Sequence, residues 1–124
     1  MTALHRPPVA IVDDDRRVLE SLEDLLESAG HSVLLFTSAQ ALLENGCLPN
    51  IGCLISDISM PVIDGFELQR LARAERPELP VILITGRHEA TDQPRAVAQG
   101  SHGFFRKPFD GGALLAAVGR ALLL

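Results

Sequence analysis

The chain has 124 residues, a formal net charge of −5 and a hydrophobic fraction of 47%. This is enough for one domain with one core, and the negative charge argues against a nucleic-acid-binding surface, which needs clustered Lys and Arg. No apolar run reaches the roughly 18 residues that span a bilayer, and residues 1–8 lack the apolar centre of a secretory signal, so we expect a cytoplasmic protein. Cys47 and Cys53 fit no disulfide or metal-binding spacing and are expected to be reduced structural thiols.

Short β-branched apolar runs alternate with longer segments of helical period, which is typical of βα units around a parallel sheet. The first unit is predicted as a strand over 9–13 and a helix that ends before Gly30; its apolar face carries Val18, Leu22, Leu25, Leu26 and Ala29. The second is a strand over 32–36 and a helix that Ser38 caps and that ends near Gly46.

The remaining three units follow the same pattern. A strand over 53–57 precedes a helix that starts at Asp64, buries Phe66 with Leu68 or Leu71 and ends before Pro77. The next strand, over 81–85, is followed by a short helix predicted to begin at Pro94 and end at Gln99, because proline is disfavoured inside a helix. The last strand covers 103–106, and the last helix covers 110–123, with Leu114, Leu115, Val118 and Leu122 on one face.

Polar residues stand where four of these strands end. Asp13 and Asp14 end the first, Asp57 the third, Thr85 the fourth, and Lys107 follows the fifth. In an open parallel sheet, ligands bind outside the carboxyl ends of the strands. We therefore expect three acids, a hydroxyl and an ammonium to share one cleft.

Three crowded carboxylates repel one another unless they share a cation, and oxygen ligands of this kind suit Mg²⁺ or Mn²⁺. An ionised aspartate beside such an ion can attack phosphorus, while a lysine and a hydroxyl neutralise the phosphoryl oxygens. The residues at the strand ends thus match phosphoryl transfer to Asp57.

Each of these signals has a simpler interpretation when taken alone. Asp15 is best read as a helix cap, and Asp64 with Gly65 as turn and helix-start residues without a ligand role. Lys107 alone would be a solvated charge, and Thr85 alone a common strand-end residue. Their joint placement at one edge favours the functional interpretation.

Four segments carry a family resemblance: VDDD at 12–15, DISMPVIDG at 57–65, ITG at 84–86 and KPF at 107–109. Together they resemble a CheY-like response-regulator receiver, and SLEDLLESAG and FTSAQALL resemble the FixJ type, whose receivers usually precede a LuxR-like helix-turn-helix. The resemblance implies a flavodoxin-like (CheY-like) doubly wound sheet of five parallel strands, in the order 2-1-3-4-5 and flanked by five helices. It also implies that residues 1–124 form one receiver domain.

The same resemblance implies a role for each matching residue. Asp57 would be the phosphoacceptor, and Lys107 the cation that pairs with the phosphoryl group. The metal ligands would be the side chains of Asp13, Asp14 and Asp57 and the backbone carbonyl of Ser59. Thr85 and Phe104 would be the switch residues, and the Lys107–Pro108 bond is expected to be cis. The donor would be a sensor histidine kinase, and the domain would catalyse only its own phosphorylation and dephosphorylation. A homodimer through the helix 4, strand 5 and helix 5 face is expected, with DNA bound only by a separate output domain and no contact with a membrane.

Some residues depart from the FixJ pattern. Ser59 and Arg87 stand where FixJ-type receivers often carry Arg and His, and Pro94 and 101–102 are also unusual, which leaves the dimer geometry open. Arg87 is expected to reach over the cleft, contact the phosphoryl oxygens and slow hydrolysis; the alternative is a solvated loop residue.

Three other classes of protein fit the residues less well. A haloacid dehalogenase phosphatase needs a DxDxT element, but Ser59 stands where the second Asp would be. A flavodoxin needs a phosphate-binding loop where this chain has three acids that would repel the phosphate of FMN. An interaction module with a vestigial site is disfavoured because all five site positions are intact. Met1 suggests the front of a protein, and the apolar residues 121–124 suggest that it continues into an output domain.

Overall fold

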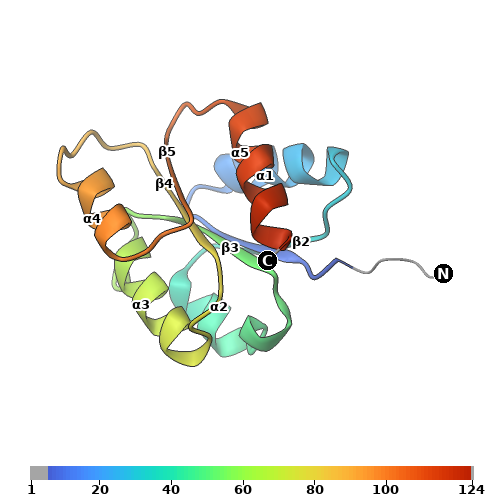
Figure 1. Cartoon of the computed structure of the whole chain (residues 1–124), viewed down its shortest axis with the longest axis horizontal. Helices are drawn as coiled ribbons and strands as arrows, with labels where there is room; N and C mark the ends of the chain where they lie inside the picture. The colour runs from blue at the N-terminus through green and yellow to red at the C-terminus, as the bar shows by residue number, and fades with distance from the viewer. Residues whose placement is uncertain (1–5, 124) are drawn as a thin grey trace.

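The computed structural model describes residues 6–123, which form a parallel sheet with helices on both faces (Figure 1). Its strands are β1 (Val9–Val12), β2 (Val33–Phe36), β3 (Cys53–Asp57), β4 (Val81–Thr85) and β5 (Gly103–Arg106). They pair in the order β2-β1-β3-β4-β5, so the predicted topology is confirmed. Met1 and Leu124, on which the expectations about the two chain ends partly rest, lie outside the described residues.

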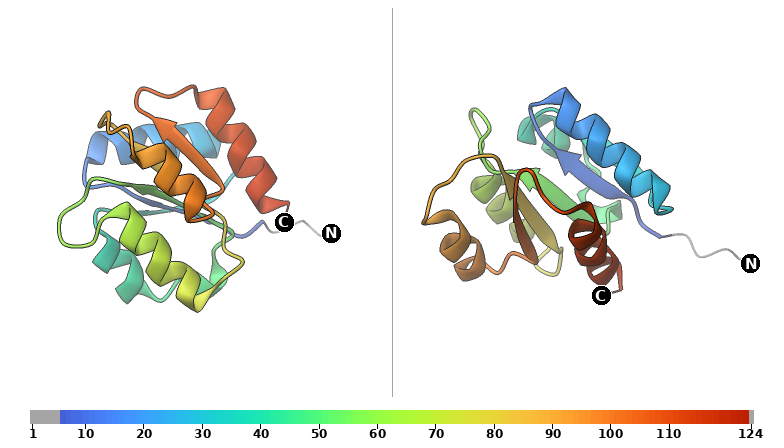
Figure 2. Two further views of the ribbon diagram at one scale, coloured as in Figure 1. Left: turned by 60° about the vertical axis from the view of Figure 1, so that its left-hand side comes forward. Right: turned by 90° about the horizontal axis from the view of Figure 1, so that it is seen from above.

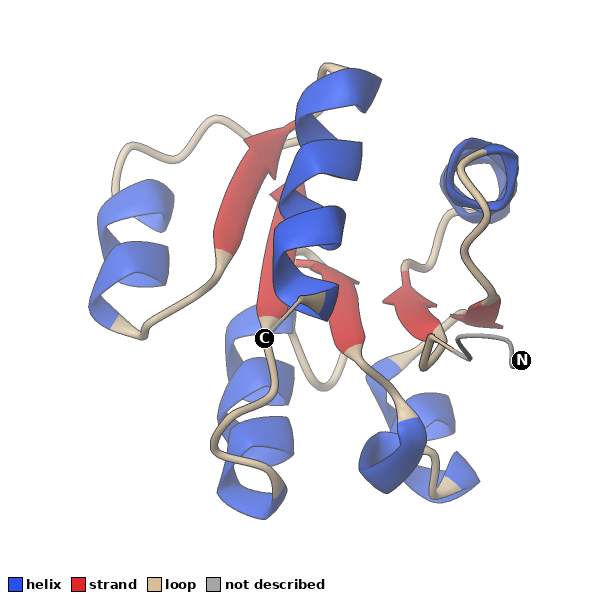
Figure 3. Cartoon of the chain, turned by 45° about the vertical axis from the view of Figure 1, so that its right-hand side comes forward, coloured by secondary structure: helices blue, strands red, loops and turns tan. Residues whose placement is uncertain are grey.

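The helices are α1 (Arg16–Ser28), α2 (Ala39–Asn45), α3 (Gly65–Glu75), α4 (Asp92–Ala98) and α5 (Gly111–Leu122), with a short 3-10 helix at Leu48–Asn50. Helices α1 and α5 cover one face of the sheet, and α2, α3 and α4 lie on the other (Figure 2). Figure 3 shows the strands enclosed between these two layers. Within residues 6–123, no helix is both long and apolar enough to cross a membrane.

The three central strands supply side chains to both faces of the sheet. Every residue of β1, β3 and β4 is buried. On β1, Val9 and Ile11 join the core beneath α1 and α5, whereas Ala10 and Val12 join the core beneath α2 and α3. Burial on both sides explains why these strands are continuous apolar runs in the sequence and makes them a firm base for the residues at their carboxyl ends.

Side chains at the helix starts fix where the helices begin. Asp15 accepts a hydrogen bond from the backbone N–H of Arg17, and Ser38 and Asp64 cap α2 and α3 in the same way. Such caps satisfy N–H groups that have no partner within the helix. The predicted capping roles of Asp15, Ser38 and Asp64 are therefore confirmed.

The predicted start of α4 is wrong. The helix begins at Asp92 rather than at Pro94. A proline is tolerated anywhere in the first turn because the N–H groups there have no intrahelical acceptor. The helix also ends one residue earlier than predicted, with Gln99 as its C-cap.

Two unusual backbone positions lie between β3 and the first turn of α3: Val62 in the loop, and Gly65, the first residue of the helix. A Cβ at Gly65 would collide with the carbonyl oxygen of Asp57, so only glycine fits there. Val62 has a φ of 70°, and its side chain is 85% exposed. This left-handed conformation is unfavourable for a β-branched residue, and the exposed side chain gains little from packing.

Replacing Val62 with glycine should stabilise the domain. A left-handed L-residue costs roughly 1–2 kcal/mol, and glycine loses roughly 0.5–1 kcal/mol more backbone entropy, so the free energy of unfolding should rise by roughly 0.5–1 kcal/mol. Urea denaturation of wild type and Val62→Gly measures the change. Val97→Gly is the control, because Val97 is 72% exposed within α4, where glycine should lower stability instead. A loss of stability in Val62→Gly would show that the left-handed conformation of Val62 is not strained.

Candidate functional site

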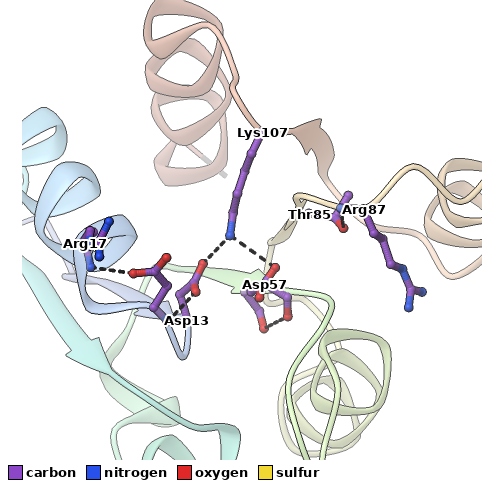
Figure 4. Close-up of polar contacts among 8 residues, drawn as sticks. Asp13, Arg17, Asp57, Thr85, Arg87 and Lys107 are labelled. Carbon is purple, nitrogen blue, oxygen red and sulfur yellow. Dashed lines mark hydrogen bonds and ion pairs between the residues drawn. The ribbon is translucent and has the colours of Figure 1, made fainter.

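The carboxyl ends of the strands bring charged side chains together at one edge of the sheet (Figure 4). Asp13 directly follows β1, Asp57 ends β3, and Lys107 directly follows β5. Lys107 Nζ lies 2.8 Å from Asp13 Oδ2 and 3.5 Å from Asp57 Oδ1. The structure thus joins two acids and a lysine that the sequence placed at three different strand ends.

Both carboxylates of this group are shielded from solvent. Asp13 is 0% exposed and Asp57 is 5% exposed. A buried charge is costly unless it is paired and hydrogen-bonded. Asp13 meets this requirement twice, because Oδ2 accepts from Lys107 and Oδ1 accepts from the backbone N–H of Asp15 at 2.9 Å.

A third carboxylate completes an acidic cluster. One oxygen each of Asp13, Asp14 and Asp57 can be chosen so that all three lie within 4.8 Å of one another, and Asp14 is exposed to solvent. Three oxygen donors at this spacing, open to water on one side, fit a hard divalent cation such as Mg²⁺, which retains several water ligands. The structure therefore brings together the three side chains that were predicted to bind a metal ion.

The crowding changes the acidity of Asp57. Burial, followed by the negative charge of Asp13, raises the pKa of Asp57 to about 6, against the opposing effect of Lys107. A cation bound between the acids would favour the ionised carboxylate, which is the nucleophilic form.

Lys107 remains a cation in this environment. Burial lowers its pKa, but the hydrogen bond and charge of Asp13, together with the charge of Asp57, outweigh burial and hold the pKa above its usual value. The Lys107–Pro108 peptide bond is cis, as expected. The site therefore offers a fixed positive charge beside Asp57.

Within the described part of the chain, neither residue predicted to form the switch has a side chain hydrogen-bonded to the acidic cluster. The Thr85 hydroxyl is buried and accepts a hydrogen bond from the backbone N–H of Arg87 at 3.0 Å. The backbone N–H of Lys107 donates to the Thr85 carbonyl at 2.7 Å, but within residues 6–123 no hydrogen bond joins the Thr85 hydroxyl to Asp57 or Lys107. Phe104 is partly buried against the core beneath α2 and α3, and Ser59 is exposed in the loop after β3.

The expectation that Arg87 reaches over the cleft is wrong for this structure. Its guanidinium donates to both carboxylate oxygens of Asp92, with Nε–Oδ2 and Nη2–Oδ1 distances of 2.7 Å. Figure 4 shows the side chain directed away from Asp57 and Lys107. Sequence reasoning missed Asp92, because an acid in the first turn of a helix is ordinary and carries no sign of a partner across a loop.

Comparison with known protein families matches residues 9–119 to the response regulator receiver domain. The chain is 41% identical over 115 residues to the transcriptional regulatory protein FixJ of Azorhizobium caulinodans, which covers 93% of this chain and 54% of that protein. It is 38% identical over 116 residues to the response regulator protein TodT of Pseudomonas putida, covering 94% and 51%. The chain thus spans about half the length of these curated relatives.

Solved structures agree with this match. The crystal structure of FixJ-N has a TM-score of 0.84 and 32% identity, and covers 97% of this chain and 96% of that one. The BeF3-activated DrrB receiver domain has a TM-score of 0.87 and 28% identity, covering 97% and 100%. The strand order, the family match over residues 9–119 and the relatives above 30% identity agree: this chain belongs to the response regulator receiver domain family, as its resemblance to the FixJ type indicated.

Proposed function

We propose that Asp57 accepts a phosphoryl group from a sensor histidine kinase in a reaction that depends on Mg²⁺. The observation that carries this proposal is the buried Asp57 carboxylate, which lies 3.5 Å from the Lys107 ammonium and beside two further acids. The family membership supports it, since receiver domains of response regulators act in phosphorelay signalling.

The chemistry follows from the charges around Asp57. A carboxylate oxygen of Asp57 forms a bond to phosphorus while the phosphorus–nitrogen bond of the kinase phosphohistidine breaks and the imidazole leaves. Lys107 neutralises charge on the transferring phosphoryl oxygens, because its ammonium is already held at the site by Asp13. Mg²⁺ held by Asp13, Asp14, Asp57 and the backbone carbonyl of Ser59 would supply further positive charge.

The phosphoryl group then shifts the domain between two packings. Thr85 leaves the Arg87 N–H and donates its hydroxyl to a phosphoryl oxygen, and Phe104 turns inward into the space that is freed. The phosphorylated form is favoured because these hydrogen bonds exist only in that state. Water later hydrolyses the acyl phosphate, so the domain catalyses only its own phosphorylation and dephosphorylation.

The proposed partners extend beyond the kinase. Residues 1–124 would act as one receiver domain that controls a separate output domain or a partner protein in the cytoplasm. A transcriptional output is favoured because FixJ is named a transcriptional regulatory protein. DNA would be bound only by that output domain, no membrane would be contacted, and a homodimer would form through the α4, β5 and α5 face.

An interaction module with a vestigial site is the second candidate, and the site geometry counts against it. A buried acid that has lost its role is a liability, because it must be paired or neutralised to remain in the core. Here Asp57 keeps both its burial and its lysine partner.

Mg²⁺ should bind the acidic cluster, and Asp13→Ala should weaken binding at least about tenfold, because one of three charged ligands is lost. Calorimetric titration with MgCl₂ measures both affinities. Asp24→Ala is the matched control, since Asp24 is exposed on α1 outside the cluster, and its affinity should equal that of wild type. Equal affinities of Asp13→Ala and wild type would contradict the metal assignment.

Acetyl phosphate with Mg²⁺ should produce a single phosphoryl adduct on the wild-type domain and none on Asp57→Asn, because an amide lacks the nucleophilic carboxylate. Intact-mass spectrometry detects the adduct. Asp64→Asn serves as the control, since Asp64 caps α3 in the adjoining loop and lies outside the acidic cluster. An adduct that persists in Asp57→Asn would rule out Asp57 as the sole acceptor.

Thr85→Ala should still bind the phosphoryl mimic beryllofluoride but should no longer transmit binding to Phe104, because the hydroxyl that follows the mimic is missing. NMR signals of the Phe104 ring report the transmission. Thr91→Ala is the control, as Thr91 is an exposed threonine whose side chain makes no capping bond to α4. A full Phe104 response in Thr85→Ala would refute the coupling.

A further inference from the structure

Helix α4 is attached to the domain mainly by polar contacts. Asp92 and Ala96 are its only buried residues, and Val97 is 72% exposed. Arg95 stacks on the ring of Phe66, with its guanidinium carbon 4.1 Å from the ring centroid. Because little apolar surface holds α4 in place, the position of the helix depends on its charged contacts.

The strongest of these contacts is the pair of Arg87 and Asp92. The Asp92 side chain is 3% exposed, the Arg87 side chain is 40% exposed, and two parallel N–H···O bonds join them. The hydrogen bonds from Arg87 lower the pKa of Asp92, and the charges of Arg106 and Arg95 act in the same direction. The pair closes the loop between β4 and α4, because Arg87 lies at its start and Asp92 opens the helix that follows.

Both switch residues are connected to this loop. The backbone N–H of Arg87 donates to the Thr85 hydroxyl. On the neighbouring strand, Arg106 lies opposite Thr85 in the register, donates to the Glu89 carbonyl at 2.9 Å, and places its guanidinium 5.1 Å from the centroid of the Phe104 ring. A single loop conformation therefore fixes the surroundings of Thr85 and Phe104 together.

We propose that the Arg87–Asp92 ion pair is a latch that holds the loop between β4 and α4, and with it the Thr85 hydroxyl, in the unphosphorylated arrangement. The inference rests on the proposed function, in which Thr85 must give up the Arg87 N–H to reach the phosphoryl group. The latch opposes that movement, so it lowers the resting population of the active packing and weakens the apparent affinity for a phosphoryl mimic. Arg87 thus acts as a positioning residue through Thr85, without touching the phosphoryl group.

The burial of Asp92 distinguishes this pair from an ordinary surface salt bridge. Exposed pairs usually contribute little because water screens them and both side chains stay mobile. Arg70 and Glu67 on α3 form a comparable two-bond contact, but their side chains are 63% and 45% exposed. They supply a matched pair that is connected to no switch residue.

The test compares Arg87→Met, Asp92→Asn and the control Arg70→Met with wild type in two measurements. The first is the affinity for beryllofluoride at fixed Mg²⁺. Arg87→Met and Asp92→Asn should bind about fivefold more tightly, since removing the latch raises the binding-competent fraction, and Arg70→Met should be unchanged. Arg87→Lys keeps the charge but loses the two-bond geometry, so its affinity should fall between those of wild type and Arg87→Met.

The second measurement is the NMR spectrum of each domain without metal or mimic. In Arg87→Met and Asp92→Asn, the Thr85 and Phe104 signals should move along the line toward their beryllofluoride-bound positions in wild type. Such a shift separates the latch from a general loss of stability, which moves signals in no common direction. Equal or weaker mimic affinity together with unmoved signals would overturn the latch. Failure of wild type to bind the mimic would overturn the proposed function, whereas binding by wild type, with equal or weaker binding and unmoved signals in the variants, would overturn the latch alone.

Discussion

The pairing of one partly exposed lysine with two buried acids constrains the rest of the structure. Lys107 reaches Asp13 and Asp57 only if the ends of β1, β3 and β5 lie at one edge of the sheet. Separating these charges would leave a carboxylate unpaired in the interior, which typically costs about 3–5 kcal/mol. The parallel sheet with its central, fully buried strands is the scaffold that keeps the three strand ends in register.

The two faces of the sheet differ in how their helices are held. Helices α1 and α5 pack through a continuous apolar core that includes Leu22, Leu26 and Leu114. On the other face, α2 and α3 contribute apolar side chains, but α4 adds only Ala96 to that core. The free energy that holds an apolar helix face against the sheet grows with the apolar area buried. A charged side chain, in contrast, can exchange one ion-pair partner for another. The domain thus combines a paired charged site with one helix, α4, that charged contacts help to hold in place.

Much of this arrangement could be predicted from the sequence, for identifiable reasons. The bounds of β3 and β4 were predicted correctly because each is an apolar run that ends in a polar residue, Asp57 or Thr85. The meeting of Asp13, Asp57 and Lys107 followed from the rule that carboxyl ends of parallel strands share an edge. The direction of the Arg87 side chain could not be predicted, because a long side chain on a loop follows the local backbone geometry. Its partner, Asp92, lies five residues away, and the sequence gives no sign that the loop brings the two together.

The site also depends on Gly65, although this residue carries no reactive group. Any side chain at position 65 would collide with the backbone of Asp57, so the first turn of α3 can pack against Asp57 only when residue 65 is glycine. Sequence variation is consequently restricted at Gly65 by the backbone of Asp57, whereas the side chain of Val62, three residues earlier, is exposed to solvent. Among variants that lose activity, position 65 would group with the charged residues although it supplies no charge, donor or acceptor through a side chain.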